Sequence, residues 1–136
     1  MLDFAASRVA LLVAEASERL GRRVQGVWVF GSFVTGRATV ASDFDLGVLC
    51  DPPLGLERAR VGDDVARAID RDVDVIDLAT APAALAWEIV TSGELAIERN
   101  EPAVERFVRR ARFAVDDDVG RNRMILLAQT AARSAR

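Results

Sequence analysis

Histidine, tyrosine and lysine are absent from this chain of 136 residues, and cysteine occurs once, at Cys50. Without histidine there can be no Ser-His-Asp triad, no Cys-His pair and no histidine-bound zinc. Without lysine there is no Walker A lysine and no lysine Schiff base. A single cysteine cannot form an internal disulfide. The ionisable groups left for chemistry are Asp, Glu, Arg and Cys50, which favours hard metal ions bound by carboxylates if the protein is an enzyme.

Long apolar runs are also missing, since none approaches the ~20 residues that span a membrane. The start of the chain lacks the pattern of a signal peptide, so we expect a cytoplasmic protein that makes no membrane contact. The net charge is −3 and all 18 basic residues are arginines. A molecule of this charge is not built to coat nucleic acid, and we expect no direct nucleic-acid binding.

Length and composition predict one domain, residues 1–136, with one core, because hydrophobic residues make up 51% of the chain. The C-terminal segment 120–136 carries several arginines and no acidic residue. Two interpretations of this basic segment stay open. It is either a solvated C-terminal helix or tail, or a docking surface for an acidic partner or RNA.

Apolar periodicity and turn residues predict that helices and strands alternate along the chain. We expect helices over residues 2–20, 56–70 and 82–93, strands over 24–30, 43–50 and 73–78, and a short edge strand over 94–98. A last helix opens at Pro102, and the acidic run Asp116–Asp118 is expected to close it. The predicted fold class is α/β or α+β, a small mixed β-sheet flanked by helices.

Two aspartates, Asp43 and Asp45, stand at the start of a predicted apolar strand. Residues i and i+2 of a strand point to the same face, with Cα atoms roughly 6–7 Å apart at a rise of ~3.3 Å per residue. Like charges at that spacing raise each other's pKa unless a cation joins them, and carboxylates with phosphate oxygens are what Mg²⁺ takes. The alternative is that both aspartates are solvated residues at a strand end.

A third carboxylate is expected from the neighbouring strand, where three aspartates occur. Asp72 and Asp74 share one face, and Asp77 lies on the other. We choose Asp74 because it stands between two valines in an apolar run, where an unpaired carboxylate is hard to tolerate. Asp72 fits a solvated position at the entry of the strand.

The pair Gly31-Ser32 follows the strand that ends at Phe30. Glycine at that point lets the backbone approach a ligand and adopt unusual dihedral angles. Ser32 offers a hydroxyl and a backbone N–H near an expected helix start, which suits a phosphate group. Gly-Ser by itself is weak evidence, and Gly36 together with the aspartates ten residues on makes the pattern specific.

The run from Gly31 to Leu46 resembles the signature of the minimal nucleotidyltransferases, which belong to the DNA polymerase β-type superfamily. Its pattern is Gly-Ser, ten residues, then Asp-x-Asp, with Ser42 before the first aspartate and Leu46 after the second. In chain length the sequence is most similar to the antitoxin of the HEPN–MNT toxin–antitoxin pairs. Several members of that group transfer AMP from ATP to a tyrosine of the HEPN toxin, an RNase, and silence it.

The resemblance implies a polymerase β-like fold, Mg²⁺ as cofactor, ATP as substrate and a hetero-oligomer with a cognate HEPN toxin. It makes Asp43 and Asp45 the ligands of two Mg²⁺ ions. Asp74 would be the third carboxylate, which ligates a metal and would accept the proton of the attacking hydroxyl. Gly31 and Ser32 would hold the β- and γ-phosphates of ATP.

The loop between the two halves of the signature departs from the usual pattern. Thr35 and Thr39 hold places where many relatives carry an arginine, and Arg37 stands between them as the residue that would serve the triphosphate. Ile97 and Ala114 occupy positions where relatives often show tyrosine. Since the chain has no tyrosine, it cannot modify itself on that residue.

Two alternative functions stay open at this point. A degenerate nucleotidyltransferase would neutralise its toxin by binding alone, although all the expected acids are present. An enzyme with a small-molecule acceptor, such as an aminoglycoside, usually adds a helical domain for that acceptor, whereas only a short segment follows Gly93 here. The sequence does not fix the nucleotide preference, because no residue can be tied to a base edge.

Overall fold

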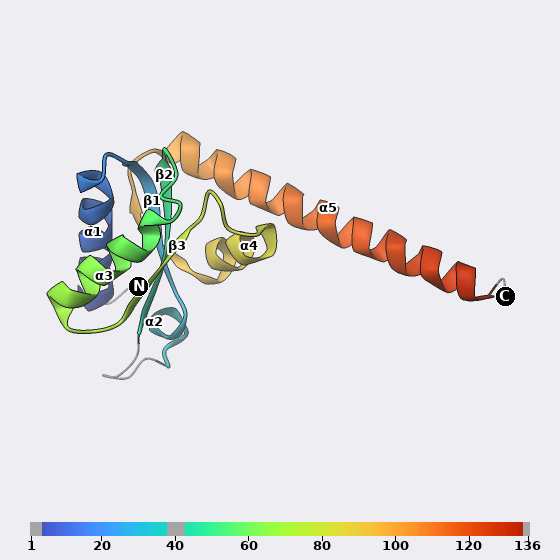
Figure 1. Ribbon diagram of the computed structural model, residues 1–136, viewed down its shortest axis with the longest axis horizontal. Helices are drawn as coiled ribbons and strands as arrows, with labels where there is room; N and C mark the ends of the chain where they lie inside the picture. The colour runs from blue at the N-terminus through green and yellow to red at the C-terminus, as the bar shows by residue number, and fades with distance from the viewer. Residues whose placement is uncertain (1–3, 38–42, 135–136) are drawn as a thin grey trace.

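The computed structural model describes residues 4–37 and 43–134, in which helices and strands alternate (Figure 1). The helices are α1 (Phe4–Arg19), α2 (Ser32–Thr35), α3 (Glu57–Ile69), α4 (Ala83–Ser92) and α5 (Glu101–Ser134). The strands are β1 (Arg23–Phe30), β2 (Phe44–Asp51), β3 (Val73–Asp77) and β4 (Glu94–Glu98). The predicted fold class, a small mixed sheet flanked by helices, is confirmed.

The four strands form one sheet in the order β3-β2-β1-β4. Strand β1 pairs antiparallel with β2 and β4, whereas β2 and β3 pair parallel. A parallel pair needs a crossover connection, and α3 supplies it between β2 and β3. Strand β4 lies at an edge, as its alternating polar and apolar residues predict.

Helices cover both faces of the sheet (Figure 1). On one face α1 and α3 bury an aliphatic cluster that includes Val13, Leu46 and Val61. On the other face α4 and the first turns of α5 bury a second cluster, which includes Ile89 and Phe107. The sheet is therefore apolar on both faces, which explains why β1 carries a nearly continuous apolar run.

Alternation along β2 decides which of its side chains reach which face. Phe44 and Leu46 belong to the cluster beneath α1 and α3, and Leu49 belongs to the one beneath α4 and α5. Asp45 therefore points to the α4 side, like Leu49. Gly47 stands between them, and a Cβ there would lie 3.1 Å from the side chain of Ile89. Asp45, the second residue of β2, lies near the end of the strand and is half-buried.

The expectation that Asp116–Asp118 closes the last helix is wrong, because α5 continues to Ser134. Its first turns pack on α4 and β1, and the remainder projects from the body (Figure 1). Aspartates and the single Gly120 lower helix propensity by ~1 kcal/mol or less each without blocking the backbone hydrogen bonds, and no proline follows. The basic segment 120–136 is helical as far as Ser134. No described helix is long and apolar enough to cross a membrane.

Two leucines in the turn between β2 and α3 allow a matched test of the core. Leu54 is 1% exposed within the α1–α3 cluster, whereas Leu56 is 93% exposed. Leu54→Ala should lower the free energy of unfolding by about 2–5 kcal/mol because it leaves a cavity. Leu56→Ala should change it by less than about 0.5 kcal/mol. Urea denaturation measures both, and equal losses would contradict this placement of the turn.

Candidate functional site

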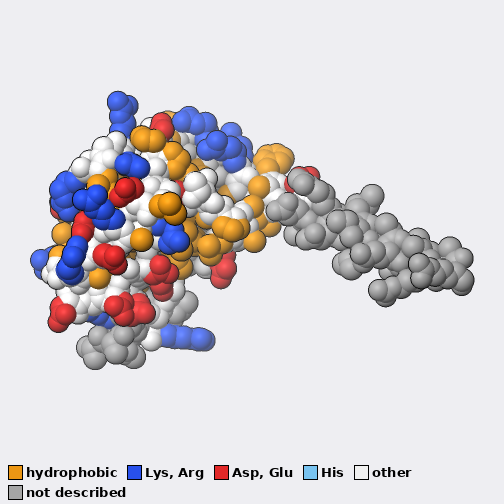
Figure 2. Space-filling model, viewed as in Figure 1, with side chains coloured by type: hydrophobic (Ala, Val, Ile, Leu, Met, Phe, Trp, Pro, Cys, Tyr) orange, Lys and Arg blue, Asp and Glu red, His pale blue; other side chains and the backbone are white. Residues whose placement is uncertain are grey.

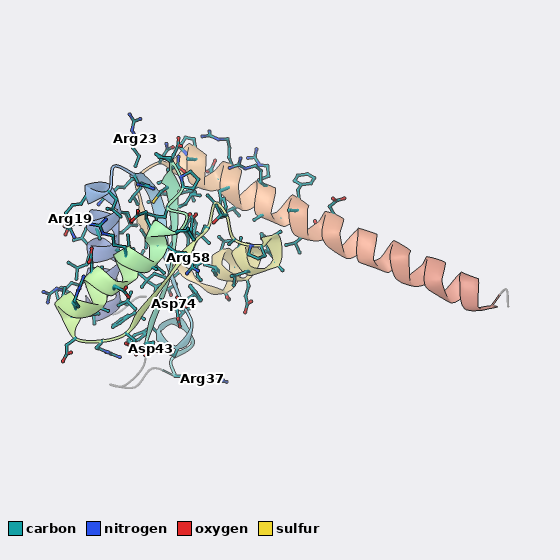
Figure 3. All side chains as sticks on the ribbon, viewed as in Figure 1. Arg19, Arg23, Arg37, Asp43, Arg58 and Asp74 are labelled. Carbon is teal, nitrogen blue, oxygen red and sulfur yellow. The ribbon has the colours of Figure 1, made fainter. Side chains whose placement is uncertain are left out.

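Three aspartates lie at the end of the sheet where β1 ends and β2 and β3 begin. Asp45 is the register partner of Asp74 across the parallel β2–β3 pair. Register partners in a sheet present their side chains on the same face. Asp43 directly precedes β2, and Figure 3 shows Asp43 and Asp74 at this same end of the molecule. Figure 2 shows several acidic side chains gathered at this end of the visible face.

The electrostatics of Asp45 show that the three carboxylates interact. The pKa of Asp45 is raised above its ordinary value, first by burial, then by the charge of Asp74, and then by the charge of Asp43. Each cause acts against the ionised form. In the absence of a cation, the site therefore carries unrelieved repulsion.

Of the two aspartates in β3, Asp77 is buried and Asp74 is exposed. The valines on either side of Asp74 pack in or against the α1–α3 cluster, but Asp74 between them is exposed, so the expectation that its carboxylate is buried is wrong; alternation along β3 turns its side chain away from α3. Asp77 is the buried carboxylate, at 2% exposure. Its Oδ2 accepts hydrogen bonds from the Gly55 N–H (2.9 Å) and the Thr80 hydroxyl (2.8 Å). Asp77 thus ties two loops together inside the protein, while Asp74 stays accessible to solvent.

The Gly31-Ser32 turn lies directly against Asp45. Gly31 has φ +76°, and a Cβ built on it would lie 2.5 Å from Oδ2 of Asp45. No side chain fits there unless the carboxylate moves. Ser32 then begins the one-turn helix α2, in which the Ser32 carbonyl accepts the N–H of Arg37 at 3.1 Å. The structure therefore brings the two halves of the sequence motif into contact.

Arg37 follows α2, is exposed, and lies at the same end of the molecule as Asp43 (Figure 3). Thr39 and Ser42 fall in the segment 38–42, which lies outside the described residues. Ile97, at one of the positions where relatives often show tyrosine, is half-buried in β4 and packs against the α1–α3 cluster.

Cysteine chemistry is absent from the site. Burial, and secondarily the charge of Asp77, raise the pKa of the Cys50 thiol to about 12. A thiol with that pKa stays protonated at neutral pH and is not a nucleophile.

The donor set of the site fits a hard divalent cation. Within residues 4–37 and 43–134, no three or more acidic or cysteine side chains are placed so that they could hold a metal ion as they stand. Yet Asp43, Asp45 and Asp74 interact through their charges and include two exposed carboxylates that can turn toward an ion. Mg²⁺ keeps several waters and takes few protein carboxylates, so an open carboxylate set suits it.

Sequence reasoning missed three neighbours of this site: Phe33, Phe44 and Arg71 stack on one another. Phe44 stands between the two motif aspartates, which is the single sequence signal that it lies near the site. Nothing in the spacing of the chain predicts that Arg71 reaches Phe33.

Comparisons with known proteins agree with this geometry. The family described as "Polymerase beta, Nucleotidyltransferase" matches residues 15–102. The curated "Protein adenylyltransferase MntA" of Shewanella oneidensis is 34% identical over 73 residues, which are 53% of this chain and 52% of that protein. The aligned part of the chain therefore spans about half the length of this relative.

Solved structures of toxin–antitoxin complexes contain chains of similar fold. A crystal structure of the toxin-antitoxin with AMP-PNP matches at a TM-score of 0.72 and 23% identity, covering 90% of this chain and 98% of the other. A complex of the tri-AMPylated Shewanella oneidensis HEPN toxin with MNT antitoxin matches at 0.69 and 21%, covering 96% and 99%. Because the family match runs from the end of α1 to the start of α5 and includes all four strands, the chain belongs to the polymerase beta nucleotidyltransferase family.

Proposed function

We propose that this chain is a Mg²⁺-dependent protein adenylyltransferase that acts as an antitoxin. It transfers AMP from ATP to a tyrosine of a cognate HEPN toxin, with which it assembles, and thereby neutralises that toxin. The observation that carries the proposal is the meeting of Asp43, Asp45 and Asp74 beside the Gly31-Ser32 turn. The adenylyltransferase relative and the AMPylated toxin complex support the choice of AMP and of a protein acceptor.

The carboxylates of Asp43, Asp45 and Asp74 would hold two Mg²⁺ ions. Bound Mg²⁺ neutralises charge on the triphosphate and on the departing diphosphate. The pKa of Asp45 is raised first by burial and then by the charges of Asp74 and Asp43, which supports this assignment because a bound cation favours the ionised carboxylate. Both exposed members of the set, Asp43 and Asp74, can reorient when the ion binds.

The loop at α2 would bind the phosphates of ATP. Gly31 has no side chain to keep a phosphate away from Asp45, and Ser32 presents its hydroxyl and backbone N–H at the start of α2. The exposed guanidinium of Arg37 would balance the negative charge of the triphosphate.

Asp74 would take the proton of the acceptor hydroxyl. The tyrosine oxygen forms a bond to the α-phosphorus as the bond from that phosphorus to the bridging oxygen of the diphosphate breaks. Exposure of Asp74 supports a protein acceptor, because a side chain on another protein can reach an uncovered carboxylate. The acceptor tyrosine must come from another molecule, since this chain has none.

The decisive experiment is mass spectrometry of the cognate HEPN protein after incubation with this chain, ATP and Mg²⁺. The wild-type chain should add AMP to a tyrosine. Asp43→Asn and Asp45→Asn should lower the rate by about 100-fold or more, because losing a metal ligand removes several kcal/mol of transition-state stabilisation. Asp63→Asn removes an exposed carboxylate of α3 and should leave the rate unchanged.

Two results would separate this proposal from its alternatives. If both Asn variants label the toxin as well as wild type does, the metal assignment is wrong. If wild type adds no AMP and the variants still protect cells, the chain is an antitoxin that acts by binding.

The stability of Asp45→Asn should depend on pH in a defined direction. The folded-state pKa of Asp45 is raised, so its ionisation destabilises the fold at neutral pH and its protonation relieves the strain. Without metal at pH 7, Asp45→Asn should therefore melt at a slightly higher temperature than wild type. The difference should vanish as the pH falls toward the ordinary value of 3.8. Thermal melts across pH measure it, and a variant less stable at pH 7 would contradict the repulsion.

Gly31→Ala tests the contact between the loop and Asp45, with Gly36→Ala as its control. Both glycines have positive φ, so alanine at either position costs about 1–3 kcal/mol of stability. A Cβ at Gly36 meets nothing within 4 Å, whereas a Cβ at Gly31 displaces the Asp45 carboxylate. AMP transfer per folded molecule should fall at least about tenfold further for Gly31→Ala. Equal rates for the two variants would show that the contact does not matter.

A further inference from the structure

Two phenylalanine rings and an arginine form a stack beside the site. Phe33 of α2 lies on Phe44, with ring centroids 4.1 Å apart and planes 13° from parallel. The guanidinium carbon of Arg71 lies 4.7 Å from the centre of the Phe44 ring and 5.4 Å from that of Phe33. These distances are within the range of cation–π attraction. One cation thus spans two rings that come from different elements.

Each member of the stack belongs to a segment that carries part of the proposed site. Phe33 follows Ser32, Phe44 lies between Asp43 and Asp45, and Arg71 is in the turn that leads into β3 and Asp74. The backbone adds a second link here, because the Phe44 N–H donates to the Asp72 carbonyl at 3.0 Å.

The stack lies on the opposite face of the sheet from the carboxylates. Phe44 is 2% exposed and belongs to the α1–α3 cluster, against which Phe33 also packs. Since Asp45 follows Phe44 along β2, its side chain points the other way. The guanidinium therefore contacts α2 from the face of the sheet opposite the carboxylates and does not lie on the side where a nucleotide would bind.

We infer that Arg71 is a positioning residue: by stacking on Phe33 and Phe44 it holds the Gly31-Ser32 turn against Asp45. Helix α2 has only four residues, too few to be stable by its own hydrogen bonds. Its position therefore depends on side-chain anchors such as Phe33. The consequence for ATP affinity rests on the proposed function, whereas the anchoring of α2 does not.

Arginine suits this role better than lysine. Its planar guanidinium can lie against ring faces, whereas an ammonium is a compact and strongly hydrated charge. The backbone of Arg71 is itself fixed, because its N–H donates to the Ala66 carbonyl at the end of α3 at 3.2 Å. The stem of the side chain therefore leaves from a defined point toward the two rings.

Amide hydrogen exchange tests the anchoring without any ligand. Arg71→Ala should speed exchange of the Val34 and Arg37 amides, which close the turn at α2, by about tenfold. Arg67→Ala is the matched control, because it removes an arginine whose ion pair with Asp64 is on the surface of α3. If Arg71→Ala does not fold, Arg71→Met keeps an unbranched apolar stem and lacks the charge. Unchanged exchange at α2 in the folded variant would overturn the inference.

Binding of AMP-PNP with Mg²⁺, measured by calorimetry, tests the consequence for the site. Arg71→Ala should weaken binding by about tenfold, Arg71→Lys by less, and Arg67→Ala not at all. Phe33→Leu provides a double-mutant cycle: if the stack transmits the effect, Arg71→Ala loses little further affinity in the Phe33→Leu background. Fully additive losses would mean that Arg71 acts independently of Phe33, which would overturn the proposed anchoring of α2.

The exchange and the binding measurements distinguish a failure of the inference from a failure of the proposed function. Wild-type protein that does not bind AMP-PNP would contradict the proposed function and leave the exchange result intact. Wild-type binding together with unchanged affinity in Arg71→Ala would contradict the inference and leave the proposed function intact.

Discussion

The placing of a partly buried carboxylate, Asp45, beside two others at one end of the sheet is the constraint on which the site depends. The parallel pairing of β2 and β3 places Asp45 beside Asp74, and ionisation of Asp45 is disfavoured first by burial and then by the charges of Asp74 and Asp43. A fold selected for stability alone would place apolar side chains there. The surrounding structure tolerates the arrangement because the site opens to solvent at Asp43 and Asp74 and because Gly31 makes room for the carboxylate of Asp45.

Away from the carboxylates, the sheet is packed by apolar side chains on both faces, and this packing holds the site in place. Apolar layers on both faces fix the strands, so the positions of Asp45 and Asp74 follow from strand register. The buried carboxylate of Asp77 holds the far end of β3 through Gly55 and Thr80. The near end of the same strand carries the exposed Asp74. In β3, therefore, Asp77 forms buried hydrogen bonds that stabilise the fold, whereas Asp74 is exposed at the end of the strand that carries the candidate site.

Most of the fold was predictable because its signals are local: apolar periodicity marks the helices and strands, and Gly-Ser with Asp-x-Asp marks the family. The prediction failed where the answer depends on distant contacts. Apolar neighbours suggested that Asp74 is buried, and Val73 and Val75 do pack beneath α3, but Asp74 points to the other face, where it is exposed. The acidic run at Asp116 looked like a helix end, yet charge without proline does not stop a helix. Arg71 contacts Phe33, a residue far from it in the sequence, and no local pattern shows this.

The projecting part of α5 also affects how the molecule behaves in solution. A helix of 34 residues extends roughly 50 Å at 1.5 Å per residue, and only its first turns lie on the body. A projecting rod adds more frictional drag than the same number of residues folded into the body. The chain should therefore diffuse more slowly and elute earlier than a compact protein of equal mass. Subunit counts for any assembly that contains it need a method that is insensitive to shape, such as light scattering or native mass spectrometry.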